Sequence, residues 1–425
     1  MSRQVRSRAA AARTKGPAVD PVEKIEVSTE HIGLRIAAFV ILLLVGLTAL
    51  AYAFMRFITP GTGWEEIQAN SAAVTNCSSD FTLQYNLGAE RSATIERREI
   101  VTAYTEACVI AYRQFNTDEH FEDTINLYDV NHAPNKVITV NEPLYSALEM
   151  AVAADTPDRT LYMGPAYHVY QNVFFASDDS ELVDFDPLSG GETTAWYQEM
   201  AAFADDPESV SLDILGNGQV RLNVSAEYLR YAEENAIETF LDFSWMKNAF
   251  IIDYLAQTLA DKGYTYGSIS SYDGFVRNLD NRGEAQYGYS LYCGLDGSAY
   301  PAAQMLYTGT LSLVNLRTYP LGERDFLRFY VLNNGDVRVP YLCAETGLPA
   351  ETLKELTVYS GEPNASCAEL LLSALPVFTG DTADLTALTN AVWFDGTTLL
   401  YTDEALQLED FYSNGTIDFT SSHID

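Results

Sequence analysis

The main part of this sequence has little positive charge. Of its 425 residues, 25 are Lys or Arg and 59 are Asp or Glu, which gives a formal net charge of −34. Residues 1–58 hold eight of the basic groups and only four of the acidic ones, so the rest of the chain carries a net charge of −38. Nucleic-acid binding needs a basic surface that replaces phosphate counterions, and this composition excludes it for the main body.

Cysteine and histidine are also scarce, with five of each in the whole chain. An odd and sparse set of cysteines is not a disulfide framework, and at most two bridges can form. No Cys-x-x-Cys or His/Cys spacing typical of zinc ligands is present. The sequence leaves open whether any of the five is oxidised: Cys77, Cys108, Cys293, Cys343 and Cys367.

One long hydrophobic run stands near the N-terminus, where twenty residues from Ile36 to Met55 contain no charge. At about 1.5 Å per residue this run spans about 30 Å, the thickness of the hydrocarbon core of a bilayer. The segment before Arg35 is basic and the segment after Arg56 is not, so the positive-inside rule predicts a cytoplasmic N-terminus. A cleavable signal peptide with Ala51 and Ala53 at its cleavage site is the alternative. Its apolar region would be about 7–15 residues long, so the length favours an uncleaved single-pass anchor in the cell membrane.

No linker rich in Pro, Gly or Ser divides the chain after the Pro60–Gly63 break, and no internal repeat is visible. We therefore expect four parts. These are a cytoplasmic basic tail (1–32), a transmembrane helix (33–57), a linker (58–75) and one extracytoplasmic domain (76–425).

Hydrophobic periodicity predicts the secondary structure of this domain. Helical spacing predicts five helices: Ile95–Phe115, Pro143–Ala154, Ala226–Ala236, Trp245–Lys262 with Gly263 as its cap, and Ala365–Leu375 with Pro376 beyond it. Strand patterns are found at Lys136–Val140, Gln219–Val224, Tyr264–Ser270, Phe326–Leu332, Leu356–Tyr359, Ala391–Phe394 and Thr398–Tyr401. The last two flank Asp395-Gly396 and predict a hairpin. Helices and strands mix without strict alternation, which indicates an α+β domain.

Three stretches carry residues suited to binding chemistry. Asp242–Asp253 leads from an acidic turn into an amphipathic helix, whose N-terminal N–H groups are suited to phosphate. Tyr341–Pro349, with a turn at Thr346-Gly347, is typical of a surface loop. The third stretch, Ala365–Leu375, is apolar except for Glu369 and Ser373, which lie one helical turn apart. A carboxylate and a hydroxyl on one face are oxygen ligands of the kind that Mg²⁺ accepts. The alternative is that Glu369 reaches the surface or pairs with an arginine.

Taken in order, these stretches resemble the ApbE family of FAD:protein FMN transferases. Asp242–Asp253 matches the family pattern D-L-x-x-x-A-K-G-Y-A-x-D without a gap, and Ser270–Gly274 matches a strand that ends in Gly-Gly. Asp325–Tyr330 resembles D-Y-x-R-F-Y, Pro340–Pro349 resembles H-I-x-D-P-x-T-G-x-P, and Ala368–Leu375 resembles A-D-x-x-S-T-A-L. The resemblance covers about residues 95–410 and depends on five weak motifs in the right order.

The resemblance implies a mixed α/β domain that binds FAD and Mg²⁺ and moves FMN to a Ser or Thr of a partner flavoprotein, with release of AMP. Carried over residue by residue, it implies a metal site at Glu369, Ser373 and the backbone carbonyl of Trp245. Lys247 and Glu369 are the implied catalytic groups. The implied FAD-binding positions are Asn248, Asp253, Gly274, Arg328, Thr346 and Gly347.

The sequence departs from the family pattern at several of these positions. The metal-binding Asp and Thr of the family are Glu369 and Ser373 here, and the family Lys falls on Asn248, with Lys247 one residue earlier. One residue is about 100° of rotation on a helix, which turns Lys247 away from the family direction. The family His and Asp of the loop motif are replaced by Pro340 and Cys343, and the first Gly of Gly-Gly is Asp273.

Three hypotheses follow from the sequence. The first is an active FMN transferase. The second is a catalytically degenerate protein of the same fold that acts as a flavin- or protein-binding module at the outer face of the membrane. The third is an unrelated exported α+β domain, such as a solute-binding or envelope protein.

Overall fold

The chain divides into two units, Met1–Thr59 and Pro60–Asp425. The computed structural model describes residues 31–58, 61–71, 75–89, 91–154, 159–322, 325, 328–349, 353–379, 382–409 and 417–424. Most of the predicted basic tail lies outside these residues, as do Phe326 and Leu327 of a predicted strand.

The described residues of the first unit form one long helix, α1 (Ile32–Ile58). Its segment Ile32–Tyr52 has a mean hydropathy of 2.5, and the large apolar side chains described there are exposed. Among the described helices, α1 is the one that is long and apolar enough to cross a membrane.

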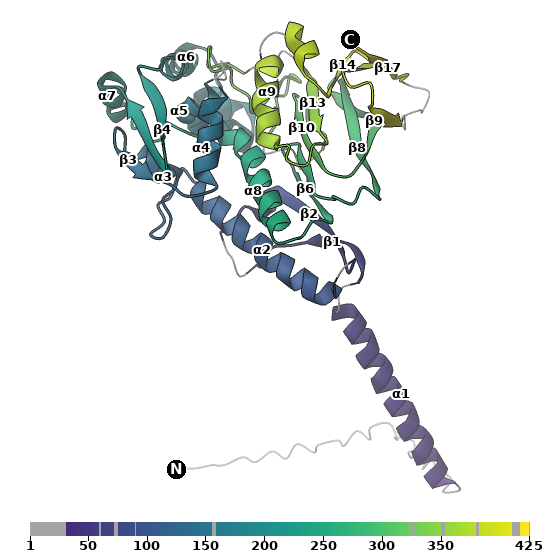
Figure 1. Cartoon of the computed structure of the whole chain (residues 1–425). Coiled ribbons are helices and arrows are strands. Elements are labelled where there is room, and N and C mark those ends of the chain that lie inside the picture. The colour runs from purple at the N-terminus through teal and green to yellow at the C-terminus, as the bar shows by residue number, and fades with distance from the viewer. Residues whose placement is uncertain are drawn as a thin grey trace, which may run out of the picture. The chain divides into compact units, whose positions relative to one another are not determined.

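The second unit is organised around a nine-stranded sheet with the strand order β1-β2-β6-β7-β10-β13-β14-β15-β17. All neighbouring strands in it are antiparallel except β15 and β17 (Figure 1). The strands are Gly63–Ile67, Phe81–Leu87, Gly267–Ser271, Phe275–Asn278, Leu311–Arg317, Glu355–Ser360, Ala391–Asp395, Thr398–Tyr401 and Thr420–His423, in the same order.

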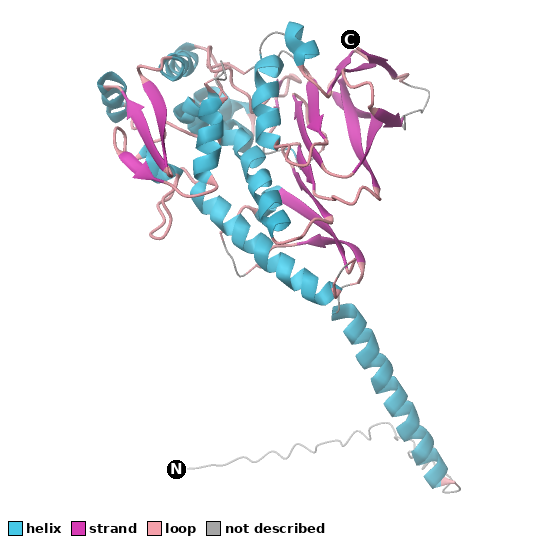
Figure 2. Ribbon diagram, in the orientation of Figure 1, coloured by secondary structure: helices cyan, strands magenta, loops and turns pink. Residues whose placement is uncertain are grey.

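Helices cover one face of this sheet, and a second sheet covers part of the other. The helices are α2 (Ala93–Gln114), α8 (Lys247–Asp261) and α9 (Cys367–Thr379), which contact one another in sequence order and pack on β2, β6, β7, β10 and β13 (Figure 2). The second sheet, β16-β9-β8, is formed by Gln407–Glu409, Ser298–Thr308 and Gln286–Leu295. A smaller apolar core lies between the two sheets and includes Leu291, Met305, Leu311 and Leu313.

A helical lobe completes the second unit. It holds α3 (Leu127–Asn131), α4 (Leu144–Ala153), α5 (Gly164–Tyr170), α6 (Gly191–Asp205) and α7 (Ala226–Glu234). A three-stranded sheet, β3-β5-β4, lies with them and is formed by Val137–Thr139, Gln219–Val224 and Val210–Gly216. A short hairpin, β11 (Tyr330–Val331) and β12 (Val337–Arg338), precedes the loop that resembles the fourth family motif.

The mixed helix and strand content is confirmed, and the five predicted helices are all present. Two boundaries differ from the prediction. The predicted helix at Trp245 begins as a 3₁₀ turn, Ser244–Met246, before α8, while Gly263 has the positive φ of 81° that suits a C-terminal cap. Pro376 lies inside α9 rather than beyond it. Pro lacks only one N–H and leaves the apolar face of α9 intact, so packing on the sheet outweighs the lost hydrogen bond.

Several strands were not predicted. Residues 63–67, within the predicted linker, form β1 at the edge of the large sheet, because Ile67 is buried while its neighbours face solvent. Of the predicted strand Phe326–Leu332, the described part contains only the two residues of β11. The predicted hairpin at Asp395-Gly396 is confirmed as β14–β15, with Asp395 paired to Thr398.

Buried Glu355 is an exception among the apolar residues of β13. Its side chain is 6% exposed, and its Oε2 atom has no hydrogen-bond partner among the described residues. Burial raises the pKa of Glu355 to about 7, although the Tyr319 hydroxyl, the Gly294 N–H and Lys354 favour the charged form.

The free energy of unfolding is therefore expected to depend on pH through Glu355. Between pH 4.5, its ordinary pKa, and about 7 the folded protein keeps a proton that the unfolded chain has lost, so stability falls as the pH rises through this window. Glu355→Gln removes this contribution, and urea unfolding at several pH values should show a shallower fall. Exposed Glu362→Gln is the control, and equal slopes for wild type and Glu355→Gln would contradict the prediction.

Candidate functional site

Segments far apart in the chain meet where α8 and α9 begin. These segments are the turn before α8, the β6–β7 turn, the region around Arg328, and the start of α9. Each of them contains one of the motifs that resemble the ApbE family. Their contacts define the candidate site.

The N-terminus of α9 is capped by Asp253, a residue of α8. Its carboxylate accepts hydrogen bonds from the backbone N–H groups of Cys367 (3.0 Å) and Ala368 (2.9 Å) and from the hydroxyl of Ser366 (2.6 Å). The first N–H groups of a helix have no partner within the helix, and a negative charge there is stabilised by the helix dipole. A side chain of α8 therefore sets where α9 begins.

Ser366 also accepts a hydrogen bond from the backbone N–H of Glu369 at 3.2 Å. A Ser followed three residues later by Glu, just before an apolar run, is a known signature of a helix start. This local signal places Ser366 at the helix N-terminus but carries no information on its partner Asp253, which lies more than 100 residues earlier in the chain.

Arg277 on β7 forms an ion pair with Asp253, and both side chains are largely buried, with 13% and 18% exposed. Arg277 thereby compensates the charge of the capping carboxylate. Asp253, predicted to contact FAD, thus lies inside a network that joins α8, α9 and β7.

A second network lies at the start of α8. The Asn248 amide donates a hydrogen bond to Asp273, and the Arg328 Nε atom lies 3.0 Å from the other oxygen of the same carboxylate. Asn248 and Arg328 are buried, and Asn248 Oδ1 has no hydrogen-bond partner among the described residues. The structure therefore brings together three positions that the family motifs place in different stretches.

Gly274 follows Asp273 and requires glycine for two reasons. Its φ is +92°, and a Cβ atom built on it would lie 2.3 Å from the backbone oxygen of Asn315 on β10. The second glycine of the family pair is thus explained by the close approach of two strands.

Lys247, the first residue of α8, is exposed and lies near Asp80 and Asp242. The pKa of both carboxyl groups is raised by burial, and the positive charge of Lys247 offsets only part of this increase. Asp242 also accepts a hydrogen bond from the Ser244 N–H at 2.7 Å. Sequence reasoning missed Asp80, because it lies in a short turn before β2 with no recognisable pattern around it.

Aromatic side chains pack together beside these networks. The ring of Tyr341 contacts Trp245 and Phe378 of α9 edge to face, with ring centroids 4.7 Å and 5.1 Å apart. The Trp245 Nε1 atom donates to the hydroxyl of Tyr167 on α5 at 3.2 Å. The predicted metal ligand Trp245 therefore has its ring buried, which leaves its backbone carbonyl as the relevant group.

The loop Tyr341–Pro349 is held in place from the helical lobe. Gly347 has a φ of +70°, and a Cβ there would lie 2.3 Å from the backbone oxygen of Tyr197 on α6. Gly347 is buried, whereas Thr346 is exposed and accepts a hydrogen bond from the Leu348 N–H within the loop. Of the two predicted FAD-binding residues here, Thr346 is the one that presents a side chain to solvent.

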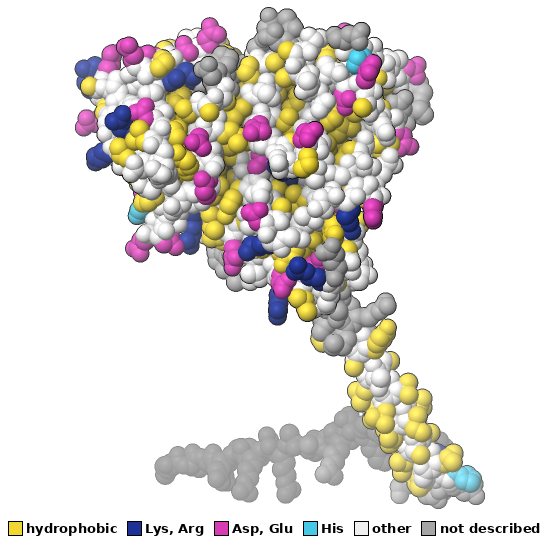
Figure 3. Space-filling model, in the orientation of Figure 1, with side chains coloured by type: hydrophobic (Ala, Val, Ile, Leu, Met, Phe, Trp, Pro, Cys, Tyr) yellow, Lys and Arg dark blue, Asp and Glu magenta, His cyan; other side chains and the backbone are white. Residues whose placement is uncertain are grey.

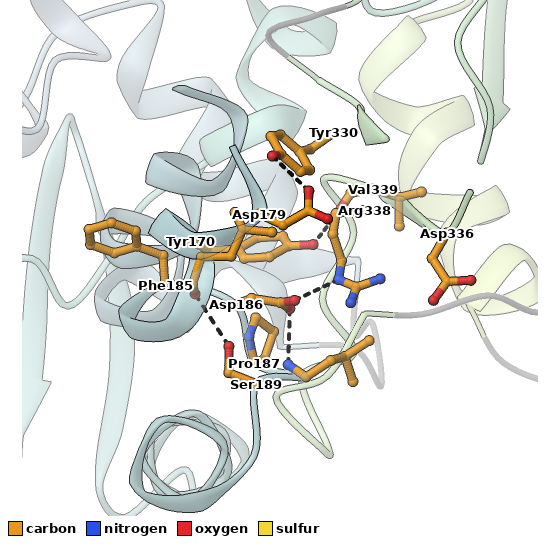
Figure 4. Close-up of polar contacts among 12 residues, drawn as sticks. Tyr170, Asp179, Phe185, Asp186, Pro187, Ser189, Tyr330, Asp336, Arg338 and Val339 are labelled. Atoms are coloured by element: carbon orange, nitrogen blue, oxygen red, sulfur yellow. Dashed lines mark hydrogen bonds and ion pairs between the residues drawn. The ribbon is translucent and has the colours of Figure 1, made fainter. Parts of the chain in front are cut away.

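Figure 4 shows how the preceding hairpin is anchored to residues 179–189. Arg338 forms an ion pair of 2.8 Å with buried Asp186, and the Tyr170 hydroxyl donates to the Val339 carbonyl at 2.7 Å. Tyr330 donates to Asp179 at 3.0 Å. These contacts fix the direction in which the chain enters the loop.

Glu369 and Ser373 are both exposed on α9. The Ser373 hydroxyl donates to the Leu370 carbonyl at 2.8 Å, which leaves its oxygen able to accept or to coordinate. Neither side chain hydrogen-bonds to the Asn248–Asp273–Arg328 network in the described part of the chain. Two oxygen donors one turn apart, open to solvent, fit Mg²⁺, which keeps several waters when bound. The described residues contain no group of three or more His, Cys, Asp or Glu arranged for a metal.

The arginines around the site form ion pairs with aspartates of the protein itself. Besides the pairs Arg277–Asp253, Arg328–Asp273 and Arg338–Asp186, Arg317 pairs with Asp325 at 2.9 Å. Acidic side chains are scattered over the visible face of the second unit, and basic ones are few (Figure 3). An anionic ligand at this face therefore depends on Lys247, backbone N–H groups and a cation.

Comparisons with known proteins give a likeness in fold but not in sequence. No protein-family model and no curated protein matches the sequence. The structure is similar to the flavin transferase ApbE of Vibrio cholerae, with a TM-score of 0.50 and 11% identity over 79% of this chain and 93% of that one. Scores of 0.49 and 0.47 are found for the flavinyl transferase ApbE of Pseudomonas stutzeri and the ApbE protein of Thermotoga maritima. Their identities are 12% and 15%, over 78% and 82% of this chain and 90% and 96% of theirs.

The Vibrio cholerae likeness shows that the second unit has an ApbE-like fold, as the motifs implied. At 11% identity it does not extend to activity. The roles of the predicted site residues therefore depend on the geometry described above.

Removal of the α9 cap should destabilise the protein. Asp253→Ala removes three hydrogen bonds and leaves Arg277 buried without its partner, so the free energy of unfolding should fall by about 3 kcal/mol. Asp261→Ala, an exposed change at the other end of α8, should alter it by less than about 0.5 kcal/mol. Urea unfolding of both variants tests this. A fall in the free energy of unfolding for Asp253→Ala that is as small as that expected for Asp261→Ala would show that the cap is not important for stability.

Proposed function

We propose that this protein binds FAD on the face formed by the start of α8, α9 and the loop Tyr341–Pro349, and transfers FMN to a partner flavoprotein. The observation that supports the proposal is the meeting of motif-like segments at one place in an ApbE-like fold. Asn248, Asp273 and Arg328 come from three separate stretches and contact one another. Such a convergence is expected of a site and not of unrelated surface loops.

The protein acts, in this proposal, at the outer face of the cell membrane. The helix α1 serves as a single-pass anchor, with the basic tail in the cytoplasm and the acidic body outside. Digestion of the body by protease added to intact cells tests this orientation.

Mg²⁺ would be held by Glu369, Ser373 and the carbonyl of Trp245. When bound, it would neutralise charge that develops on the pyrophosphate. Lys247, exposed at the start of α8, would contribute a second positive charge to the dinucleotide. Thr346, Gly347, Gly274 and Arg328 would line the FAD site. Asp253 would hold α9 against α8, and Asn248 would hold the β6–β7 turn at the start of α8.

The reaction transfers the FMN phosphoryl group from the phosphoanhydride of FAD to a hydroxyl, where it forms a phosphodiester. The oxygen of a Ser or Thr hydroxyl on the acceptor forms a bond to the phosphorus on the FMN side of the pyrophosphate. The bond between that phosphorus and the bridging oxygen breaks, and AMP leaves with the bridging oxygen. The hydroxyl proton passes to water, so no oxidant or reductant is needed.

A second function is favoured by the network around Asp273. This carboxylate stands where the family has glycine, and it already occupies the Arg328 guanidinium and the Asn248 amide. Pro340 and Cys343 also replace the family His and Asp. A protein with these changes would act as a flavin- or protein-binding module without transfer.

Mg²⁺-dependent FAD binding and AMP release separate these functions. The full-length protein in detergent is incubated with FAD, Mg²⁺ and a flavoprotein domain, and the melting temperature, the AMP formed and the acceptor mass are measured. A transferase gives all three signals, a flavin-binding module gives only a thermal shift, and the absence of every signal would refute both the transferase and the flavin-binding function.

Variants test the assignment of residues in the transferase. Glu369→Ala should lower AMP release at least about 100-fold, or about 3 kcal/mol of transition-state stabilisation, because it removes the one charged metal ligand. Lys247→Ala should lower it about tenfold. Exposed Glu362→Ala is the matched control. An unchanged rate in Glu369→Ala would show that the metal assignment is wrong.

Asp273→Gly tests whether the aspartate network weakens binding. The change restores the family glycine and releases the Arg328 guanidinium, so FAD should bind about tenfold more tightly by calorimetry, as expected for one charge-assisted hydrogen bond. Asp213→Gly, which releases Arg221 on β5 instead, is the control and should leave FAD affinity unchanged. Equal affinity of Asp273→Gly and wild type would show that Arg328 does not face the dinucleotide.

A further inference from the structure

Two of the five cysteines lie side by side in the large core. Cys77 precedes the short 3₁₀ turn Ser78–Asp80, and Cys108 lies in the middle of α2. Both are buried, with 6% and 0% of their surface exposed, and the structure holds both as free thiols. Nothing in the proposed flavin chemistry uses either residue.

The backbone places the two residues within reach of a disulfide. The Cys77 N–H donates to the Cys108 carbonyl with an N···O distance of 3.3 Å. The amide nitrogen lies about 1.5 Å from its own Cα and the carbonyl oxygen about 2.4 Å from its own, so the two Cα atoms would be about 7.2 Å apart if these links were collinear, and they are closer wherever the links bend. Disulfide-bonded cysteines have Cα atoms about 4.4–6.8 Å apart.

The two side chains also influence each other. The neighbouring Cys108 thiol, together with burial, raises the pKa of the Cys77 thiol well above its usual value. The thiols of two of the other cysteines point elsewhere: Cys293 donates to the Gly396 carbonyl and Cys367 to the Val276 carbonyl, both at 3.3 Å. Cys343 is half-buried on the loop of the candidate site.

We propose that Cys77 and Cys108 form a disulfide bond when the protein folds in an oxidising environment. The bond would tie the turn that carries Asp80 to α2, on the side of α8 where Lys247 begins the helix. A covalent link between segments this far apart in sequence constrains the unfolded chain and stabilises the fold. The proposal is independent of the flavin function, because it depends only on the contact between the two residues.

The oxidant is a disulfide compound, as in thiol–disulfide exchange. The thiolate of one cysteine attacks a sulfur of that disulfide and releases one reduced thiol. The thiolate of the other cysteine then attacks the mixed disulfide, forms the protein S–S bond and releases the second thiol. The two protons of the cysteine thiols end on the two released thiols, and the two electrons lost by the cysteines reduce the oxidant. Because both thiols are buried in the folded protein and out of reach of the oxidant, the exchange takes place while the chain folds.

Refolding with oxidised glutathione tests the proposal. The full-length protein is refolded from urea with reduced and oxidised glutathione, free thiols are alkylated under denaturing conditions, and the digest is analysed by mass spectrometry. The expected result is a Cys77–Cys108 peptide pair lighter by two hydrogen atoms than its parts, with Cys293, Cys343 and Cys367 alkylated. Alkylation of all five cysteines, or a bridge that joins another pair, would overturn the proposal.

Stability gives a second measurement. Reduction of the wild-type protein should lower its melting temperature by about 5 °C, as expected for a loop of this length in a large domain. Cys343→Ser should behave like the wild type, whereas the double variant Cys77→Ser, Cys108→Ser should not respond to reductant. A wild-type protein whose melting temperature is insensitive to reductant would count against the bond, and this readout remains available if the double variant fails to fold.

Discussion

The bond between Asp253 and the start of α9 is the contact on which the candidate site depends most. Asp253 lies on α8, its charge is compensated by Arg277 on β7, and its oxygens receive the first N–H groups of α9. One carboxylate therefore fixes two helices and a strand relative to one another. The direction of α9 decides where Glu369 and Ser373 are presented, and the direction of α8 decides where Lys247 and Asn248 stand.

The same principle of internal pairing limits what the site can bind. Arg277, Arg317, Arg328 and Arg338 each pair with an aspartate, so little free positive charge remains in an acid-rich body. Breaking one of these pairs is unfavourable, because it leaves a buried charge without a partner. An anionic dinucleotide must then be held by backbone N–H groups, Lys247 and a metal ion, or by displacing one of these aspartates. That requirement connects the acidic composition directly to the proposed need for Mg²⁺.

Sequence patterns located elements that have one buried and one solvent-exposed side. The long helix α2 and the strand β5 were predicted within two residues, because helical or alternating burial is visible in them. The central strand β10, Leu311–Arg317, was missed, since α9 covers one of its faces and the second sheet the other, which removes the alternation. The strands β8 and β9 were also not predicted, and they pack on a sheet formed from distant residues.

The sequence by itself determined the long apolar helix, the acidic character of the body and the order of the family-like motifs. These properties depend on composition and on neighbours along the chain, which a linear pattern records. Only the tertiary structure decided that Asp253 caps α9, that Asp273 holds Arg328 and Asn248, and that Cys77 meets Cys108. Each of those contacts joins residues separated by 20 or more positions. Which residues meet depends on how the helices and strands pack, and a local sequence pattern does not contain that information.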